Sequence, residues 1–109
     1  MAKVIETFTH AELKSVNVKK EAQTEGWEWR KKFIGEIGTL NLCESEHRHP
    51  GKHFVYMDYS EDGWLTTGCG ESEILDTELK LISKNSTYVF KIDRKENQSW
   101  VDEKTVPEP

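Results

Sequence analysis

The stretch from Cys43 to Phe54, CESEHRHPGKHF, gathers residue types that bind metal ions. Zinc takes about four ligands from cysteine thiolates, histidine nitrogens or carboxylates, held tetrahedrally. Cys43, His47 and His49 have the same parity, so an extended chain would project all three from one face. With Cys69 added from elsewhere in the chain, these residues make up the metal set: Cys43, His47, His49 and Cys69.

Two features of the same stretch argue against zinc. Its spacing matches none of the Cys-x-x-Cys or Cys/His pairings that recur in structural zinc sites. Pro50-Gly51 fits the central positions of a type II turn, and a tight hairpin there would place His49 opposite Lys52. The same hairpin would place Arg48 opposite His53 and turn His53 away from the other histidines of the stretch. We therefore predict a solvated polar loop and no cofactor, with zinc as the less favoured alternative.

The glycine-rich segment GCGESE, Gly68 to Glu73, is not a phosphate-binding loop. It lacks the lysine and the following serine or threonine of a P-loop, and it carries two glutamates where phosphate would have to sit. Cys69 would need a neighbouring base to act as a nucleophile, and the sequence assigns it none. No catalytic residue is predicted, and we expect a non-enzymatic protein in which Gly68-Cys69-Gly70 is a loop or bulge.

Tryptophans beside basic residues suggest a second kind of site. Aromatic rings that stack on bases, next to cations that hold phosphates, are what small barrels use to bind nucleotides or single strands. The alternative is that the tryptophans fill the core and the basic residues form a solvated face. The aromatic-basic set predicted to bind such a ligand is Trp27, Trp29, Arg30, Lys32 and Trp64.

Carboxylates crowd the middle of the chain, mostly at predicted strand ends and turns. Lys and Arg number 15 against 20 Asp and Glu, a formal net charge of −5, which disfavours binding to duplex nucleic acid. A negative surface would instead steer association with a basic protein, although ordinary solubility explains any single carboxylate. The acidic set predicted to contact such a partner is Glu44, Glu46, Glu61, Asp62, Glu71 and Glu73.

The length of 109 residues fits one domain with a modest hydrophobic core. The first residues, MAKVIETFTH, contain no apolar run of about 7–15 residues, as a secretory signal would require. No segment approaches the roughly 20 apolar residues of a membrane span. We expect a small soluble protein of the cytoplasm with no membrane partner, in which both cysteines remain thiols.

The N-terminal third predicts one helix and one strand. Thr9-His10-Ala11-Glu12 matches a capping box, so we expect a short helix from Thr9 to about Gln23, ended by Gly26. From Trp27 the apolar residues alternate with polar ones as far as Phe33, which predicts a half-buried strand.

The rest of the chain predicts short strands joined by tight turns, among them a hairpin at Asp62-Gly63. Consecutive strands should pair, giving a mainly β (α+β) fold: a small antiparallel meander or barrel of about five to six strands with one short N-terminal helix. Residues 1–93 form this single domain, and 94–109 form a charged, flexible tail from which Trp100 packs back. Exposed edges would allow two copies to pair across a two-fold axis. The expected strands lie at 39–42, 53–59, 64–67, 73–77, 78–83 and 87–93.

Two segments of the C-terminal half carry a resemblance: Trp64-Leu65-Thr66-Thr67, and Leu81-Ile82-Ser83-Lys84-Asn85-Ser86-Thr87-Tyr88. Over residues 54 to 92 the chain resembles small uncharacterised β-rich accessory proteins encoded by phages and prophages. It departs from them at Ser83, where threonine is commoner, and in the GCGESE insertion. The resemblance implies an accessory protein that binds a host protein, such as an inhibitor of a host factor, or a small signal molecule. Together with the acidic set, it favours stoichiometric binding to a basic protein partner over a ligand-binding barrel.

Overall fold

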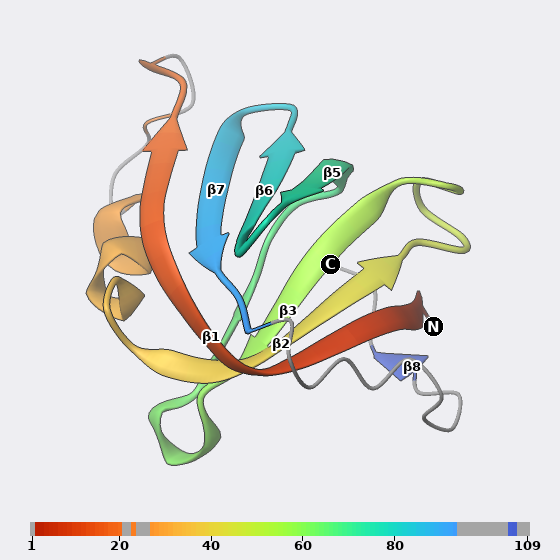
Figure 1. Cartoon of the computed structure of the whole chain (residues 1–109). Helices are drawn as coiled ribbons and strands as arrows, with labels where there is room; N and C mark the ends of the chain where they lie inside the picture. Colours follow the sequence, from red (N-terminus) through yellow and green to blue (C-terminus); the bar gives the residue numbers. More distant parts are fainter. Residues whose placement is uncertain (1, 21–22, 24–26, 94–104, 107–109) are drawn as a thin grey trace.

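Eight strands form one antiparallel sheet in which six strand positions close into a barrel (Figure 1). The computed structural model describes residues 2–20, 23, 27–93 and 105–106, without the side chains of Trp27, Thr105 and Val106. Two short 3-10 helices, η2 (Trp27–Phe33) and η3 (Ser60–Asp62), lie between strands. The strands are β1 (Ala2–Val18), β2 (Ile37–Glu44), β3 (His53–Asp58), β4 (Trp64–Thr66), β5 (Gly70–Leu75), β6 (Glu78–Ser83), β7 (Ser86–Lys91) and β8 (Thr105–Val106).

The barrel closes because β2 pairs with both β1 and β3, at the two ends of the order β2-β1-β7-β6-β5-β3. β4 and β5 follow one another along the same edge of β3, so they act as one strand broken at its middle. β8 adds to β1 outside this circuit. The prediction of a small antiparallel meander or barrel is therefore confirmed, and the structure is a closed barrel. Consecutive strands pair from β1 to β4 and from β5 to β7, whereas β4 does not pair with β5. The part of the predicted tail from 94 to 104, including Trp100, and residues 107–109 lie outside the described residues.

The predicted N-terminal helix is wrong, because β1 continues as a strand to Val18. Its pairing with β2 and β7 is interrupted by register shifts, each of which adds a residue to the strict alternation of a strand. The buried positions are consequently spaced by three, two and three residues, which resembles the spacing of a helical face. These positions are Phe8, Ala11, Leu13 and Val16.

The strand predicted from Trp27 to Phe33 is also wrong, because this segment forms η2. Phe33 is buried while Trp29 is exposed, although both were expected on one face of a strand. The only pairing of this corner with β1 is a single bridge between Leu13 and Ile34, so a strand here would lack a partner among the described residues. No helix among the residues that the structure describes is long and apolar enough to cross a membrane.

Large apolar side chains fill the barrel, and the described core residues come from all six strand positions. A second, smaller cluster of Ala2, Cys43 and Phe54 lies on the opposite face of β2 and β3, because Cys43 and Phe54 alternate with inward-facing residues. The barrel core includes Phe8, Leu13, Leu40, Leu42, Val55, Met57, Leu65, Leu79, Leu81, Tyr88 and Phe90.

The seam between β3 and β5 depends on a single backbone pair, His53 with Gly70. Gly70 also pairs with Ser83 of β6, so it joins the two halves of the sheet. A Cβ atom at Gly70 would fall 1.9 Å from the backbone oxygen of Ile82. Only glycine therefore allows the strands to approach this closely. Gly70, predicted to belong to a loop or bulge with Gly68 and Cys69, is instead the first residue of β5, which pairs with β6 without a register shift.

We predict that Gly70→Ala lowers the free energy of unfolding by roughly 3 kcal/mol, because the added methyl group must push β6 away from β5. Gly68→Ala is the matched control, since a Cβ there would lie at ordinary contact distance, 3.6 Å, from the Ser83 side chain. Urea unfolding of both variants measures the difference. Equal stability of the two variants would contradict this account of the seam.

Candidate functional site

The structure separates the residues of the metal set. Cys43 is buried in β2 and Cys69 is half-buried just before β5, and both pack in the small cluster around Phe54. His47 and His49 are exposed in the loop between β2 and β3. Within the described ranges, no three His, Cys, Asp or Glu side chains are grouped so that they could hold a metal ion. The four predicted ligands therefore do not converge.

The histidine-rich loop contains the predicted type II turn inside a wider hairpin. The amide of Lys52 donates to the carbonyl of His49 at 2.9 Å, and Gly51 has a φ of 83°, as such a turn requires. The predicted register of Arg48 opposite His53 is wrong, because His53 pairs with Glu44 and leaves residues 45–52 as the loop. Ser45 closes the wider loop, with its hydroxyl accepting from the amide of His49 at 3.0 Å.

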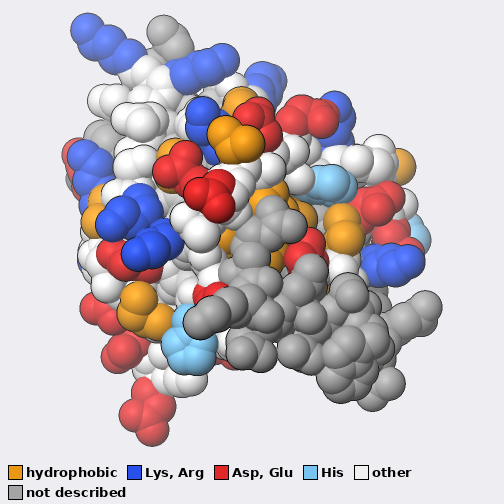
Figure 2. Space-filling model, viewed as in Figure 1, with side chains coloured by type: hydrophobic (Ala, Val, Ile, Leu, Met, Phe, Trp, Pro, Cys, Tyr) orange, Lys and Arg blue, Asp and Glu red, His pale blue; other side chains and the backbone are white. Residues whose placement is uncertain are grey.

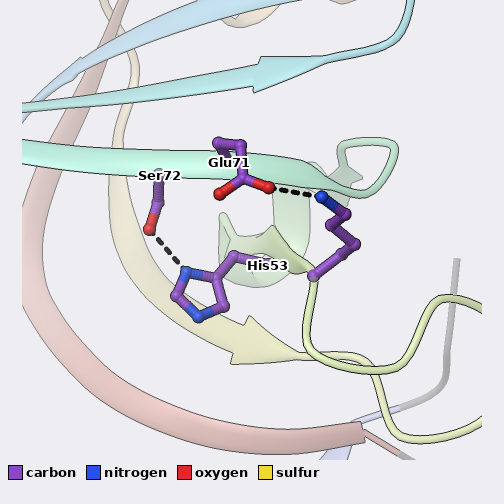
Figure 3. Close-up of polar contacts among 4 residues, drawn as sticks. His53, Glu71 and Ser72 are labelled. Atoms are coloured by element: carbon purple, nitrogen blue, oxygen red, sulfur yellow. Dashed lines mark hydrogen bonds and ion pairs between the residues drawn. The ribbon is translucent and has the colours of Figure 1, made fainter.

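Two side-chain contacts span the seam beside Gly70 (Figure 3). His53 Nδ1 lies 2.6 Å from the Ser72 hydroxyl, and Lys52 Nζ lies 2.5 Å from a carboxylate oxygen of Glu71. The hydrogen bond from Lys52 and then its charge hold the pKa of Glu71 below the ordinary value. Histidine beside serine is also a component of nucleophilic sites, but here the pair links the two strands that share one backbone pair. We assign these contacts to barrel closure.

Arg30 of the aromatic-basic set points toward the barrel interior. Its guanidinium lies 4.7 Å from the ring centre of Trp29, which is 45% exposed. Burial raises the pKa of Tyr88 inside the barrel, and the charge of Arg30 and hydrogen bonds from Ser86 and Arg30 oppose this shift. Because Arg30 interacts with an interior tyrosine, it is poorly placed to hold an external phosphate.

The remaining members of the aromatic-basic set lie on different elements. Lys32 of η2 has its Nζ 5.2 Å from the ring centre of Phe33. Trp64 of β4 is 62% exposed and pairs with Asp58 of β3. The side chain of Trp27 lies outside the described residues. Of the described side chains of the set, those of Trp29, Arg30 and Lys32 lie on η2 and that of Trp64 lies on β4.

A cleft of about 220 Å³ lies between η2 and η3. It is lined by Lys32 and Phe33 from η2, by Glu36 just after η2, and by Asp62 from η3. One carboxylate comes from each side, so the cleft brings together charges that are far apart in the sequence. Lys32 and Asp62 were predicted, but in different sets.

Tyr59 does not line this cleft, but its ring contacts Phe33, which does. Its ring stacks on Phe33 at 4.7 Å between ring centres and 8° between planes, and its carbonyl accepts from the Asp62 amide at 3.2 Å. Gly38 makes room for the ring, since a Cβ there would lie 2.8 Å from Tyr59 Cδ1. The stack thus ties η2 to the turn that holds η3.

The hydroxyl of Tyr59 is buried, and within the described structure it has no hydrogen-bond partner. The residue is only 5% exposed. Burial, followed by the negative charge of Glu36, raises the pKa of Tyr59 to about 12. A buried polar group without a partner costs about 1–3 kcal/mol, so this hydroxyl is an unusual feature of the free protein.

The fold also divides the acidic set. Glu61 and Asp62 belong to η3 beside the cleft, whereas Glu71 and Glu73 lie on β5 and Glu44 and Glu46 at the end of β2 and beyond it. Glu71 pairs with Lys52, and Glu73 faces Lys80 across the β5–β6 pair. Figure 2 shows acidic side chains gathered at the lower left of the molecule, where the β3–β4 turn lies in Figure 1. This turn also includes Asp58, whose carboxylate accepts a hydrogen bond from the Ser60 amide at 2.8 Å.

Two residues that line the cleft were missed in the sequence, Phe33 and Glu36, and so was Tyr59, which stacks on Phe33. Phe33 and Tyr59 read as ordinary core positions of two strands, and nothing in their spacing predicts that they stack. Gly38 is the one available signal, because a glycine among alternating residues indicates a close approach.

Searches with protein-family models, among curated proteins and among solved structures find no match to this chain.

We predict that Tyr59→Phe leaves the free energy of unfolding unchanged or raises it by about 1 kcal/mol, because it removes a buried hydroxyl without a partner. The folded-state pKa of about 12 exceeds the ordinary value of 10.0, so the folded protein holds this proton more tightly. The stability that arises from this difference in pKa is complete below pH 10, the ordinary pKa, and is lost as the pH rises toward 12.

Thermal unfolding between pH 9 and pH 12 tests the prediction, with Tyr59→Phe expected to lose less stability over that range than the parent protein. Tyr56→Phe keeps the Tyr59 hydroxyl, so this variant should lose as much stability between pH 9 and pH 12 as the parent protein. A destabilised Tyr59→Phe at neutral pH would mean that the hydroxyl has a partner in the folded protein.

Proposed function

We propose that this protein is a non-enzymatic binding protein that contacts a basic protein partner through the η3 face. We define the η3 face as Ile37, Asp58, Glu61, Asp62 and Trp64. The observation that carries the proposal is the 62% exposed indole of Trp64 among carboxylates. Exposed tryptophans beside charged residues are frequent energetic centres of protein interfaces.

Backbone register supports the placement of Trp64 on this face. Asp58 pairs with Trp64 on one side and with Thr39 on the other, so the three side chains point to the same side of the sheet. Ile37 lies two residues before Thr39 on that side of β2 and is also exposed. Glu61 and Asp62 follow in the turn between β3 and β4. The face thus combines exposed apolar area with three carboxylates.

The charge of the η3 face determines which partner suits it. Grouped carboxylates attract a basic surface during association and disfavour acidic partners. Because these carboxylates are exposed, salt should weaken the association steeply. The net charge of −5 also attracts a basic partner, over longer distances.

The filled barrel favours contact on the outside over a ligand held inside. Described side chains such as Phe8, Tyr88 and Phe90 occupy the interior. The cleft between η2 and η3 measures about 220 Å³. A second cleft, lined in part by Asn17 and Ile82, measures about 260 Å³. Pockets for small molecules usually measure about 300–1,000 Å³. The resemblance to phage accessory proteins fits the same mode, in which the protein acts by stoichiometric contact with a host factor.

We predict that Trp64→Ser weakens partner binding by about tenfold or more, because truncation of a central aromatic side chain commonly costs at least 1.4 kcal/mol or so. The triple variant Asp58→Asn, Glu61→Gln, Asp62→Asn should bind less tightly at low salt and show a shallower salt dependence. The matched control is Glu71→Gln with Glu73→Gln, which removes carboxylates from β5.

The test is affinity capture from an extract of the source cells with the parent protein and each variant, followed by titration of the captured protein. Supporting results are a basic captured protein, loss with Trp64→Ser and retention by the β5 control. Capture of an acidic protein, or equal capture by all variants, would contradict the proposal.

A further inference from the structure

We infer that η2 is a lid over a gap in the strand pairing of the barrel, and that it opens as a unit while the barrel stays folded. This inference goes beyond the proposed function and does not depend on it. It rests on the position of the gap, on the contacts that hold η2 there, and on two buried polar atoms at that contact.

The gap arises where β1 leaves β2. The last pair between these two strands joins Glu12 to Ile37, whereas β1 continues to Val18 and pairs with β7 over that length. After Glu12, the edge of β1 that faces away from β7 therefore has no strand beside it in the described part of the chain. Figure 1 shows η2 alongside this half of β1. A 3-10 helix thus takes the place that a further strand would occupy.

Few contacts hold η2 in this place. Of its described side chains, only Phe33 is buried, Arg30 is half-buried and the others are exposed. Just after η2, Ile34 forms a bridge with Leu13, and the amide of Gly35 donates to the Leu13 carbonyl at 3.0 Å. Elements with few buried apolar contacts open at a lower free energy than the core does.

Two buried polar atoms make the closed position of η2 costly. Nε of Arg30 and the hydroxyl of Tyr59 are the buried side-chain polar atoms that lack a hydrogen-bond partner in the described structure. Arg30 belongs to η2, and the ring of Tyr59 stacks on Phe33 of η2. Opening therefore carries the guanidinium into water and uncovers one face of the tyrosine ring. Because a buried donor without a partner is destabilising, and more so when it is charged, hydration of Arg30 favours the open position.

The barrel can stay folded when η2 opens. None of the strand pairs that close the described barrel involves η2. Arg30 does reach the interior, where burial raises the pKa of Tyr88, and the charge of Arg30 and hydrogen bonds from Ser86 and Arg30 oppose this shift. Leu13, whose carbonyl accepts from Gly35, also belongs to the core. Opening of η2 thus gives solvent access to the interior from the side and leaves every described strand pair intact.

The test is hydrogen exchange of the full-length, 15N-labelled protein, followed by NMR at increasing concentrations of urea. The amide of Gly35 reports on η2, and the slowest amides of the β6–β7 pair report on the barrel. After correction for intrinsic rates, we expect Gly35 to exchange at least about a hundredfold faster, with a smaller dependence on urea, because opening of η2 exposes little surface. Equal exchange and equal urea dependence would mean that η2 opens only when the barrel unfolds, and the inference would be wrong.

Two variants separate the lid from the barrel. Phe33→Leu removes the stacked ring and should speed exchange at Gly35 by about fivefold. The matched variant Val55→Ala removes buried methyl groups from β3 and should speed exchange of the β6–β7 amides by about tenfold. It should leave Gly35 unchanged, because the barrel remains intact in the open state. If Val55→Ala speeds exchange at Gly35 by the same factor as in β6 and β7, η2 is part of the barrel core and the inference is overturned.

Discussion

The approach of β5 to both β3 and β6 at Gly70 is the constraint on which the rest of the molecule depends. The barrel closes through the pairing of β2 with β3 and of β3 with the broken strand formed by β4 and β5. His53 with Gly70 is the one backbone pair given between β3 and β5 in the described structure, and it leaves no room for a side chain at Gly70. Once the barrel is closed, its interior becomes a packed core and its outer surface becomes the place for contact with other molecules. The same closure places β4 beyond β5 on the edge of β3, so that Trp64 emerges beside the β3–β4 turn.

The stack of Phe33 on Tyr59 is the second interaction that organises the proposed surface. η2 has only one backbone bridge to β1 nearby, so this aromatic contact fixes its position against the turn between β3 and β4. It brings a carboxylate from each side to one cleft, and the hydroxyl of Tyr59 is buried without a partner in the described structure. Phe33 and Tyr59 hold η2 against this turn by packing, which explains why both read as core in the sequence.

The sequence predicts the parts of this fold that depend on local pattern. Alternation and tight turns locate β6 and β7, and apolar residues on both parities locate β3. Short connections predict an antiparallel meander or barrel. β1 was mistaken for a helix because its bulges change the spacing of buried residues, and pairing with two distant strands decides its form. Trp64 and Asp62 were already candidates because exposed aromatics and turn carboxylates are visible as residue types. Glu36 and Tyr59 were not, because their role arises from a contact between segments that no local pattern specifies.

The length of β1 has a consequence for how the chain reaches its fold. Residues near its start pair with β2 and β8, and those near its end pair with β7, so its two edges are completed by segments from opposite parts of the sequence. During synthesis β1 emerges before β7, so the hydrogen bonds between them must wait until β7 has been made. Contacts between segments so far apart in sequence slow folding, because a long loop must close before they form. The edge of β1 that pairs with β7 therefore stays unpaired on the nascent chain over that interval, when it is open to pairing with another chain.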